Sequence, residues 1–175
     1  MAIFNLRQEI LKEHSKIQCS RIVHWVDSNQ QRFDELFKLF LHDEYRVVQR
    51  SAWPVSRAVI AHPEFIKNHW VALIANLKKP NLHDSVKRNS IRLLQYINIP
   101  KKYQGEIMNI CFSYLESLTE ALAIKVFSMS VLLELAKLYP EIMTELKIII
   151  EDQLPGQSAG FKSRAKKVLS QLDKL

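Results

Sequence analysis

The sequence predicts an all-α fold, a right-handed α-α superhelix built from about five helix pairs. Two observations predict it: apolar residues recur at helical spacing along most of the chain, and one pattern returns at a near-constant interval. The pattern spaces four residues as i, i+4, i+7 and i+11, which places them on one stripe of an α-helix. It starts at Val48, Val86, Ile124 and Phe161, at intervals of 38, 38 and 37 residues, and a fainter copy starts at Ser15, 33 residues before Val48.

The second position of each full copy is a small residue, which lets helix backbones approach where they cross. Neither helix of a pair can cover its apolar stripe alone, so consecutive pairs must stack. A four-helix bundle would need fewer and longer helices and no such repeat. The stripes comprise Ser15, Cys19, Ile22 and Val26; Val48, Ala52, Val55 and Val59; Val86, Ser90, Leu93 and Ile97; Ile124, Ser128, Val131 and Leu135; and Phe161, Ala165, Val168 and Leu172.

Other segments of helical period lie between the stripes and supply the first helix of each later pair. Proline is tolerated in the first turn of a helix and disfavours helix at the residue before it. Pro63, Pro100 and Pro140 each precede one of these segments, so each marks both the end of one helix and the start of the next. The segments lie at about residues 33–41, 65–77, 107–115 and 142–149.

The helix pairs divide the chain into five repeats within a single domain, residues 1–175. Pro54 falls inside a predicted helix and should kink that helix or split it into two segments. The longest loop is expected at residues 154–160, and no linker or low-complexity segment marks a second domain. The expected repeats are approximately residues 3–28, 30–62, 63–98, 100–138 and 140–174.

Glycine and cysteine are scarce in this chain of 175 residues, which holds three glycines and two cysteines. Because close backbone approach to a phosphate needs glycine, phosphate-cradling loops are not expected. Cys19 and Cys111 have the spacing of neither a disulfide framework nor a zinc site. Both stand among apolar residues, so we expect two buried, reduced thiols, as in cytosolic proteins.

The chain is basic, with a formal net charge of +7 and a pI near 9.4. This balance favours acidic partners, such as a nucleic acid, an acidic protein surface or an anionic membrane. The first nine residues lack the apolar segment of a signal peptide, and no apolar run approaches the length of a membrane-spanning helix. We therefore expect a cytoplasmic protein that does not bind membranes.

Residues 123–129 (AIKVFSM), 145–151 (ELKIIIE) and 158–165 (SAGFKSRA) carry a resemblance to a group of small bacterial HEAT-like proteins of unknown role. More broadly, residues 30–175 resemble the HEAT and armadillo superfamily of α-solenoids, less tightly around residues 51–53. The resemblance implies the solenoid fold and no particular activity. Some members of the group carry the label adenylosuccinate lyase. That activity is not expected here, because the chain lacks the serine-containing, glycine-rich signature loop of those lyases.

In solenoids of this kind, the second helices of the pairs line a concave face that binds partners. Basic residues gather beside the buried stripes of the second and third of these helices, and one repeat further on at Lys125. Arginine there would supply charge-assisted hydrogen bonds, and tryptophan an apolar anchor. The candidate binding residues are Arg46, Gln49, Arg50, Trp53, Arg57, Lys87, Arg88, Arg92 and Lys125.

These residues favour a non-enzymatic scaffold or adaptor that binds an acidic protein or peptide through the concave, basic face. The alternative is binding of nucleic acid through the same face, since basic residues spaced one repeat apart could neutralise several phosphates. A third and more distant hypothesis is an enzyme resembling the alkylpurine DNA glycosylases, a HEAT-like group. It is disfavoured because the predicted second helices offer no inward aspartate for that chemistry.

The sequence contains no recognised metal-binding or nucleotide-binding motif. The six histidines show neither His-x-x-x-His nor His-Glu-x-x-His spacing. The chain also has no P-loop and no dinucleotide fingerprint. Catalytic residues, a metal ion, a cofactor and a small-molecule substrate are therefore not expected.

Overall fold

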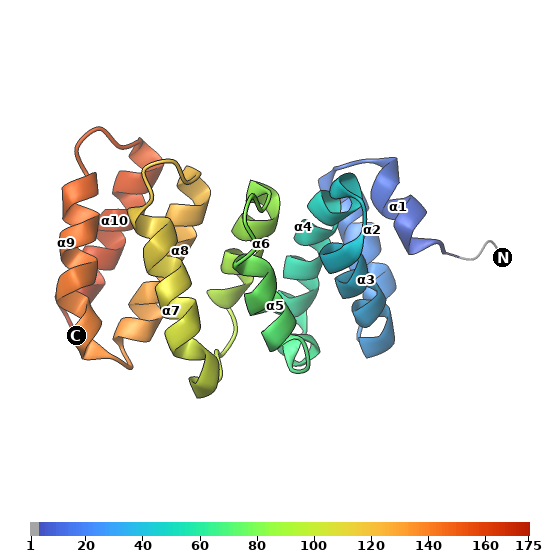
Figure 1. Ribbon diagram of the computed structural model, residues 1–175, viewed down its shortest axis with the longest axis horizontal. Helices are drawn as coiled ribbons and strands as arrows, with labels where there is room; N and C mark the ends of the chain where they lie inside the picture. Colours follow the sequence, from blue (N-terminus) through green and yellow to red (C-terminus); the bar gives the residue numbers. More distant parts are fainter. Residues whose placement is uncertain (1–3) are drawn as a thin grey trace. The chain divides into compact units, whose positions relative to one another are not determined.

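The computed structural model describes residues 4–175, and within this range the chain forms α-helices and two 3-10 helices without any β-strand (Figure 1). The predicted all-α fold class is confirmed. The helices are α1 (Leu6–Lys12), α2 (Lys16–Val26), α3 (Gln30–His42), α4 (Tyr45–Ala61), η1 (Pro63–Ile66), α5 (Trp70–Leu77), α6 (Asp84–Leu94), α7 (Lys101–Glu116), α8 (Leu122–Ala136), η2 (Pro140–Ile142), α9 (Met143–Gln153) and α10 (Ala159–Leu172).

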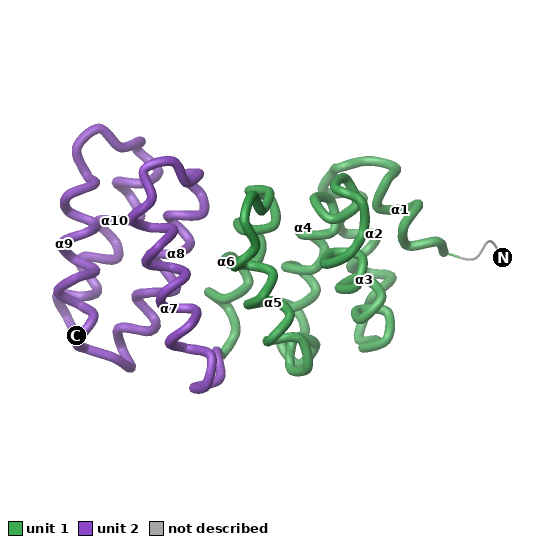
Figure 2. Tube along the Cα trace, in the orientation of Figure 1, with its two compact units in different colours: residues 1–98 green, residues 99–175 purple. Residues whose placement is uncertain are grey.

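The chain divides into two compact units, residues 1–98 and 99–175, of which the first is described from Phe4 onwards (Figure 2). We call them unit 1 and unit 2. The division falls between two of the predicted repeats, 63–98 and 100–138. Two sequence predictions involve residues 1–3, which lie outside the described residues. They are the first repeat, which is predicted to begin at residue 3, and the lack of a signal peptide in the first nine residues. A single domain over residues 1–175 stays a prediction.

Unit 1 is organised around α4, which packs against α1, α2, α3, η1 and α6. The first three helices begin where the sequence supplies a cap. The side chains of Asn5, Ser15 and Asn29 each accept a hydrogen bond from the backbone N–H three residues further on. Each bond satisfies a donor that the first turn of a helix leaves unpaired.

An aromatic cluster in unit 1 joins α3 to η1. The ring of Phe33 stacks on that of Phe65, with 4.9 Å between centroids, and contacts the ring of Phe37 at 5.7 Å. All three side chains are buried, as is Phe40 one turn further along α3. The cluster explains why a short 3-10 helix keeps a fixed place beside α3.

The predicted apolar stripes face the interior of each unit. Of their twenty members, seventeen are buried, and the eight in α8 and α10 of unit 2 are all among them. Ser15, Val48 and Ile97 are partly exposed. Ser15 is the cap of α2 rather than a member of it, and Ile97 follows the end of α6 at Leu94. The helical period therefore predicted the buried side of each second helix correctly.

The prolines behave as predicted at helix starts, and inside α4 one of the two predicted alternatives is contradicted. Pro63 and Pro140 open η1 and η2, and Pro100 is the cap of α7. The prediction of one helix over residues 65–77 is wrong, since η1 precedes α5 as a separate 3-10 turn. Of the two alternatives predicted for Pro54, a split into two segments is wrong, because α4 continues from Tyr45 to Ala61, and a kink stays a prediction. Neighbouring helices pack along α4 on several sides, which offsets the backbone hydrogen bond that proline cannot make.

Ser90 tests whether the small residue of a stripe is required. Its side chain is 1% exposed, and its hydroxyl has no hydrogen-bond partner among residues 4–175. We expect Ser90→Ala to raise the free energy of unfolding by about 1 kcal/mol, because it removes a buried polar group that is not paired. Ser90→Leu should lower the same quantity by about 1–3 kcal/mol through overpacking. Urea unfolding followed by circular dichroism measures both, and a leucine variant as stable as the parent would disprove close helix approach at this position.

In unit 2, α8 packs against α7 and α10, and the loop before α10 is short. Helix α10 begins at Ala159, with Ser158 as its cap, so the predicted loop over residues 154–160 ends two residues earlier than expected. Gly156 in this loop has a φ of +79°, a conformation that side chains with a Cβ rarely adopt. Among residues 4–175, no helix has both the length and the apolar character that crossing a membrane requires.

Candidate functional site: a basic surface on unit 1

Five candidate residues lie on one side of α4. Arg46, Gln49, Arg50, Trp53 and Arg57 are spaced as i, i+3, i+4, i+7 and i+11, which is again one stripe of a helix. Arg46 and Arg57 are exposed, and the other three are partly exposed. The same helix turns its buried stripe towards the core, so this second stripe is covered only in part.

Helix α6 places Lys87, Arg88 and Arg92 beside α4. The two helices pack against each other, and the hydroxyl of Ser85 donates a hydrogen bond of 3.1 Å to the backbone carbonyl of Gln49. Arg88 is exposed, and Lys87 and Arg92 are partly exposed. We call the eight residues on α4 and α6 the arginine face: Arg46, Gln49, Arg50, Trp53, Arg57, Lys87, Arg88 and Arg92.

The turn between α1 and α2 lies against the arginine face. Arg50 Nη1 donates a hydrogen bond of 2.7 Å to the backbone carbonyl of Leu11, in the last turn of α1. A carbonyl there has no partner within its own helix, and a cation is favoured at that end of the helix dipole. The ring of His14 contacts that of Trp53, with 5.9 Å between centroids. Arg50 therefore holds α1 in place, in addition to contributing charge.

The charges of these arginines affect the pKa values of two other groups in unit 1, His14 and Cys19. Burial lowers the pKa of His14, and the charges of Arg50 and Arg88 lower it further. On α2, burial raises the pKa of Cys19 to about 11, against an opposing effect of Arg57 and Arg92. The arginines therefore act on both side chains, and the thiol still stays protonated at neutral pH.

The arginines of this surface lack acidic partners. Among residues 4–175, Arg46, Arg57, Arg88 and Arg92 form no ion pair with a carboxylate, although the acidic groups Asp43 and Glu9 elsewhere in unit 1 are paired. Unit 1 holds fifteen basic and nine acidic residues, a net of +6, whereas unit 2 holds ten and nine, a net of +1. The positive charge of the chain is thus concentrated in unit 1, where like charges on the arginine face repel one another.

Lys125 belongs to unit 2, and its ammonium is used inside that unit. The residue is 5% exposed, and its Nζ donates a hydrogen bond of 2.8 Å to Gln153 Oε1. Gln153 in turn donates to the backbone carbonyl of Leu115 at 2.8 Å. Burial lowers the pKa of Lys125, opposed by the charge of Glu120. Lys125 stands in the same repeat position as Gln49 and Lys87, but the structure gives it a structural role in joining α7, α8 and α9.

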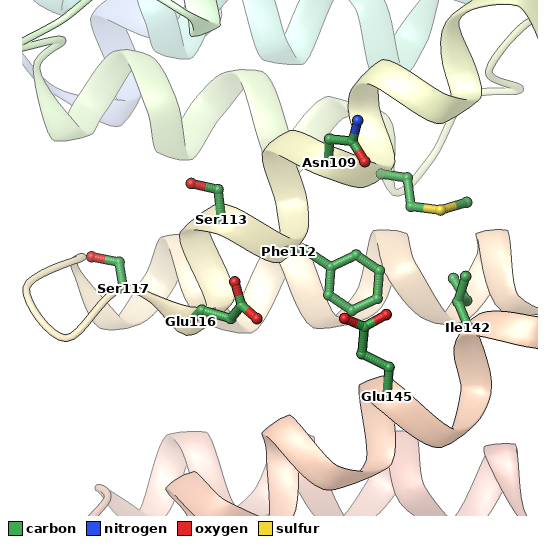
Figure 3. A pocket seen from close by; sticks show the side chains of 8 residues that line it. Asn109, Phe112, Ser113, Glu116, Ser117, Ile142 and Glu145 are labelled. Carbon is green, nitrogen blue, oxygen red and sulfur yellow. The ribbon is translucent and has the colours of Figure 1, made fainter.

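Unit 2 contains a cleft that the sequence analysis missed. It has a volume of about 610 Å³ and opens between α7 and the start of α9. Figure 3 shows the ring of Phe112 close to the carboxylates of Glu116 and Glu145, which come from different helices. Met108, Phe112 and Glu116 recur every fourth residue, a helical stripe in the sequence, but nothing in the sequence pairs it with Glu145. An aromatic ring with two carboxylates suits a cation with an apolar stem, so this lining is opposite in charge to the arginine face.

The remaining groups to consider are the possible metal ligands and the two thiols. No group of three or more histidine, cysteine, aspartate or glutamate side chains in residues 4–175 could hold a metal ion. Cys19 and Cys111 are buried and unpaired, as predicted. Burial raises the pKa of Cys111 to about 12, which disfavours a reactive thiolate in the same way as at Cys19.

The chain matches a known protein family. A family model described as a HEAT repeat domain matches residues 6–172, nearly the whole chain. HEAT repeat domains generally serve as scaffolds for protein interactions, and the family is typically non-enzymatic. No curated protein and no solved structure matches the chain.

Proposed function

Because the chain belongs to the HEAT repeat domain family, we propose that it is a non-enzymatic scaffold whose arginine face binds an acidic segment of a protein or peptide. The partner would lie across α4 and α6 of unit 1, the two helices that carry the face. Lys125 is left out of this surface, since its ammonium already bonds to Gln153.

One observation carries the proposal: arginines on two packed helices stand in or near solvent without carboxylate partners. Keeping like charges close together destabilises the free protein, and a bound anion relieves that repulsion. The planar guanidinium binds a carboxylate with two parallel hydrogen bonds, which an ammonium cannot do. The absence of acidic partners within the described chain therefore leaves these groups available for a carboxylate supplied by another molecule.

Trp53 favours a protein partner over a purely electrostatic one. It is partly exposed and lies between Arg50 and Arg57 on the same stripe of α4. Tryptophan and arginine are the residues most often found to dominate the binding energy of protein interfaces. A side chain that packs on Trp53 would gain apolar contact while its neighbours in the partner meet the arginines.

The test is affinity capture from an extract of the native cell, with three versions of the full chain. These are the parent protein, Arg57→Glu/Arg92→Glu, and the control Lys166→Glu/Lys167→Glu, which makes the same change of charge on α10 of unit 2. We expect the parent and the control to retain the same protein partner after nuclease treatment. The Arg57→Glu/Arg92→Glu variant should lose it, because two attractive charges become repulsive.

Two results would contradict the proposal. Equal recovery of the partner by Arg57→Glu/Arg92→Glu would show that the arginine face is not the binding surface. Loss of the partner after nuclease treatment, together with steep weakening of binding by salt, would instead indicate nucleic acid on the same face.

A further inference from the structure

The arginines of the face are arranged at two levels along α4 and α6. On α4, Arg50 and Arg57 are seven residues apart, which is about 10.5 Å along a helix axis. On α6, Arg88 and Arg92 are four residues apart, about 6 Å along the axis. The positive charges of these arginines are therefore centred at two levels along the helix axes, roughly 6–10 Å apart.

Each level combines one arginine from α4 with one from α6. The hydroxyl of Ser85 donates to the backbone carbonyl of Gln49, which joins α6 to α4 near the N-terminal end of each helix. Because the two helices also pack against each other, they run in the same direction. Arg50 and Arg88 follow this contact by one and three residues, so they share one level, and Arg57 and Arg92 follow it by eight and seven residues, so they share the other. The electrostatics agree, since Arg50 and Arg88 lower the pKa of His14, and Arg57 and Arg92 oppose the rise in the pKa of Cys19.

Trp53 lies between the two levels. It is three residues after Arg50 and four residues before Arg57, and its ring contacts His14. The ring is partly exposed. The surface therefore presents, in order along the helices, a pair of guanidinium groups, an aromatic ring and a second pair of guanidinium groups.

From this order we infer that the arginine face recognises an extended acidic peptide in which two carboxylate side chains stand two positions apart. An extended chain advances about 3.3 Å per residue and its side chains alternate between two faces, so carboxylates two positions apart lie on the same face and span roughly 6.5 Å, which fits the distance between the two levels. Each carboxylate would sit between one arginine of α4 and one of α6, and the chain between them would pack across Trp53. This inference rests on the proposed function and adds the pattern that the partner must carry.

Fluorescence anisotropy with labelled synthetic peptides and the full chain tests the inference. All peptides contain two glutamates and two leucines in a glycine–serine background, and they differ only in the spacing of the glutamates: one, two, three or six positions. We expect the peptide with a spacing of two positions to bind about tenfold more tightly than the other three, because only it places both carboxylates on one face at the separation of the two levels. A single-stranded oligonucleotide of equal length serves as the nucleic-acid arm.

A second measurement assigns each glutamate to one level. Arg88→Gln and Arg92→Gln are suitable because neither arginine forms an ion pair within the described chain, whereas Arg50 also holds α1. Each variant is combined with peptides in which one or the other glutamate is replaced by glutamine. We expect Arg88→Gln to couple to one glutamate and Arg92→Gln to the other, a coupling that double-mutant cycles measure directly. The control Lys166→Gln on α10 should couple to neither.

Three outcomes would overturn the inference. The first is equal affinity for all spacings, or equal coupling of both arginines to both glutamates; either would show one diffuse basic patch and would leave the proposed function standing. The second is no binding of any peptide at low salt while cellular capture still depends on Arg57 and Arg92. The third is tighter binding of the oligonucleotide than of every peptide, which would point to a phosphate backbone instead.

Discussion

Phe33→Ala is expected to lower the free energy of unfolding by about 3–5 kcal/mol, the range measured for phenylalanine truncated inside well-packed cores. Phe33 is fully buried in α3, and its ring contacts those of Phe37, Phe65 and His69. Removing it takes away contacts from two helices and from the turn before α5 at once. The cavity would form where η1 meets α3, and a short 3-10 helix has little of its own structure to close it.

Urea unfolding, followed by far-ultraviolet circular dichroism, measures this loss. Phe112→Ala is the matched control, because it removes the same side chain from a partly exposed position at the cleft of unit 2. We expect the control to cost about 1 kcal/mol or less, since the site is already open to water. If Phe33→Ala cost no more than Phe112→Ala, the aromatic cluster would not be what holds η1 against α3.

Trp53→Ala is expected to weaken binding of the acidic partner by about 30-fold or more, the effect of losing an interface residue worth roughly 2 kcal/mol. Trp53 combines a large apolar ring with a place between two arginines, and it is backed by His14. The charges would remain, so the variant should still bind acidic peptides weakly and with greater sensitivity to salt. Anisotropy titration with the spaced-glutamate peptide at two salt concentrations checks both effects.

Trp25→Ala is the control for that measurement. Trp25 lies on α2 of the same unit, where its ring stacks on Phe4 at 4.8 Å and lies under the guanidinium of Arg32. The Trp25→Ala substitution removes the same type of aromatic side chain without changing the arginine face. Unchanged affinity in Trp53→Ala, or an equal loss in Trp25→Ala, would refute Trp53 as the anchor of the interface.

Much of the fold could be predicted from the sequence because the information is local. The spacing of apolar residues marks a helix and its buried side, and seventeen of the twenty predicted stripe residues are buried. Caps such as Ser15 and prolines such as Pro63 act through hydrogen bonds and backbone angles within a few residues. These features need no knowledge of the rest of the chain.

The candidate site was predictable only in part. Gln49, Lys87 and Lys125 occupy the same position in successive repeats, so the repeat pattern predicts the same environment for all three. In the structure, Lys125 instead donates a hydrogen bond to Gln153, which belongs to a later helix in unit 2. The side chain of Arg50 likewise reaches Leu11, 39 residues earlier in the chain. Neither partner has a signature that a repeat pattern could show.

The sequence by itself determined that the chain is helical, which side of each second helix is buried, and that basic residues gather on α4 and α6, since all three follow from residue type and local period. The tertiary structure alone decided that α4 runs unbroken through Pro54 and that Lys125 is enclosed. It also decided which arginines of α4 and α6 share a level, through the contact of Ser85 with Gln49. The physical reason is that helical period is a property of neighbouring residues, whereas the partner of a side chain depends on which distant segments are packed against it.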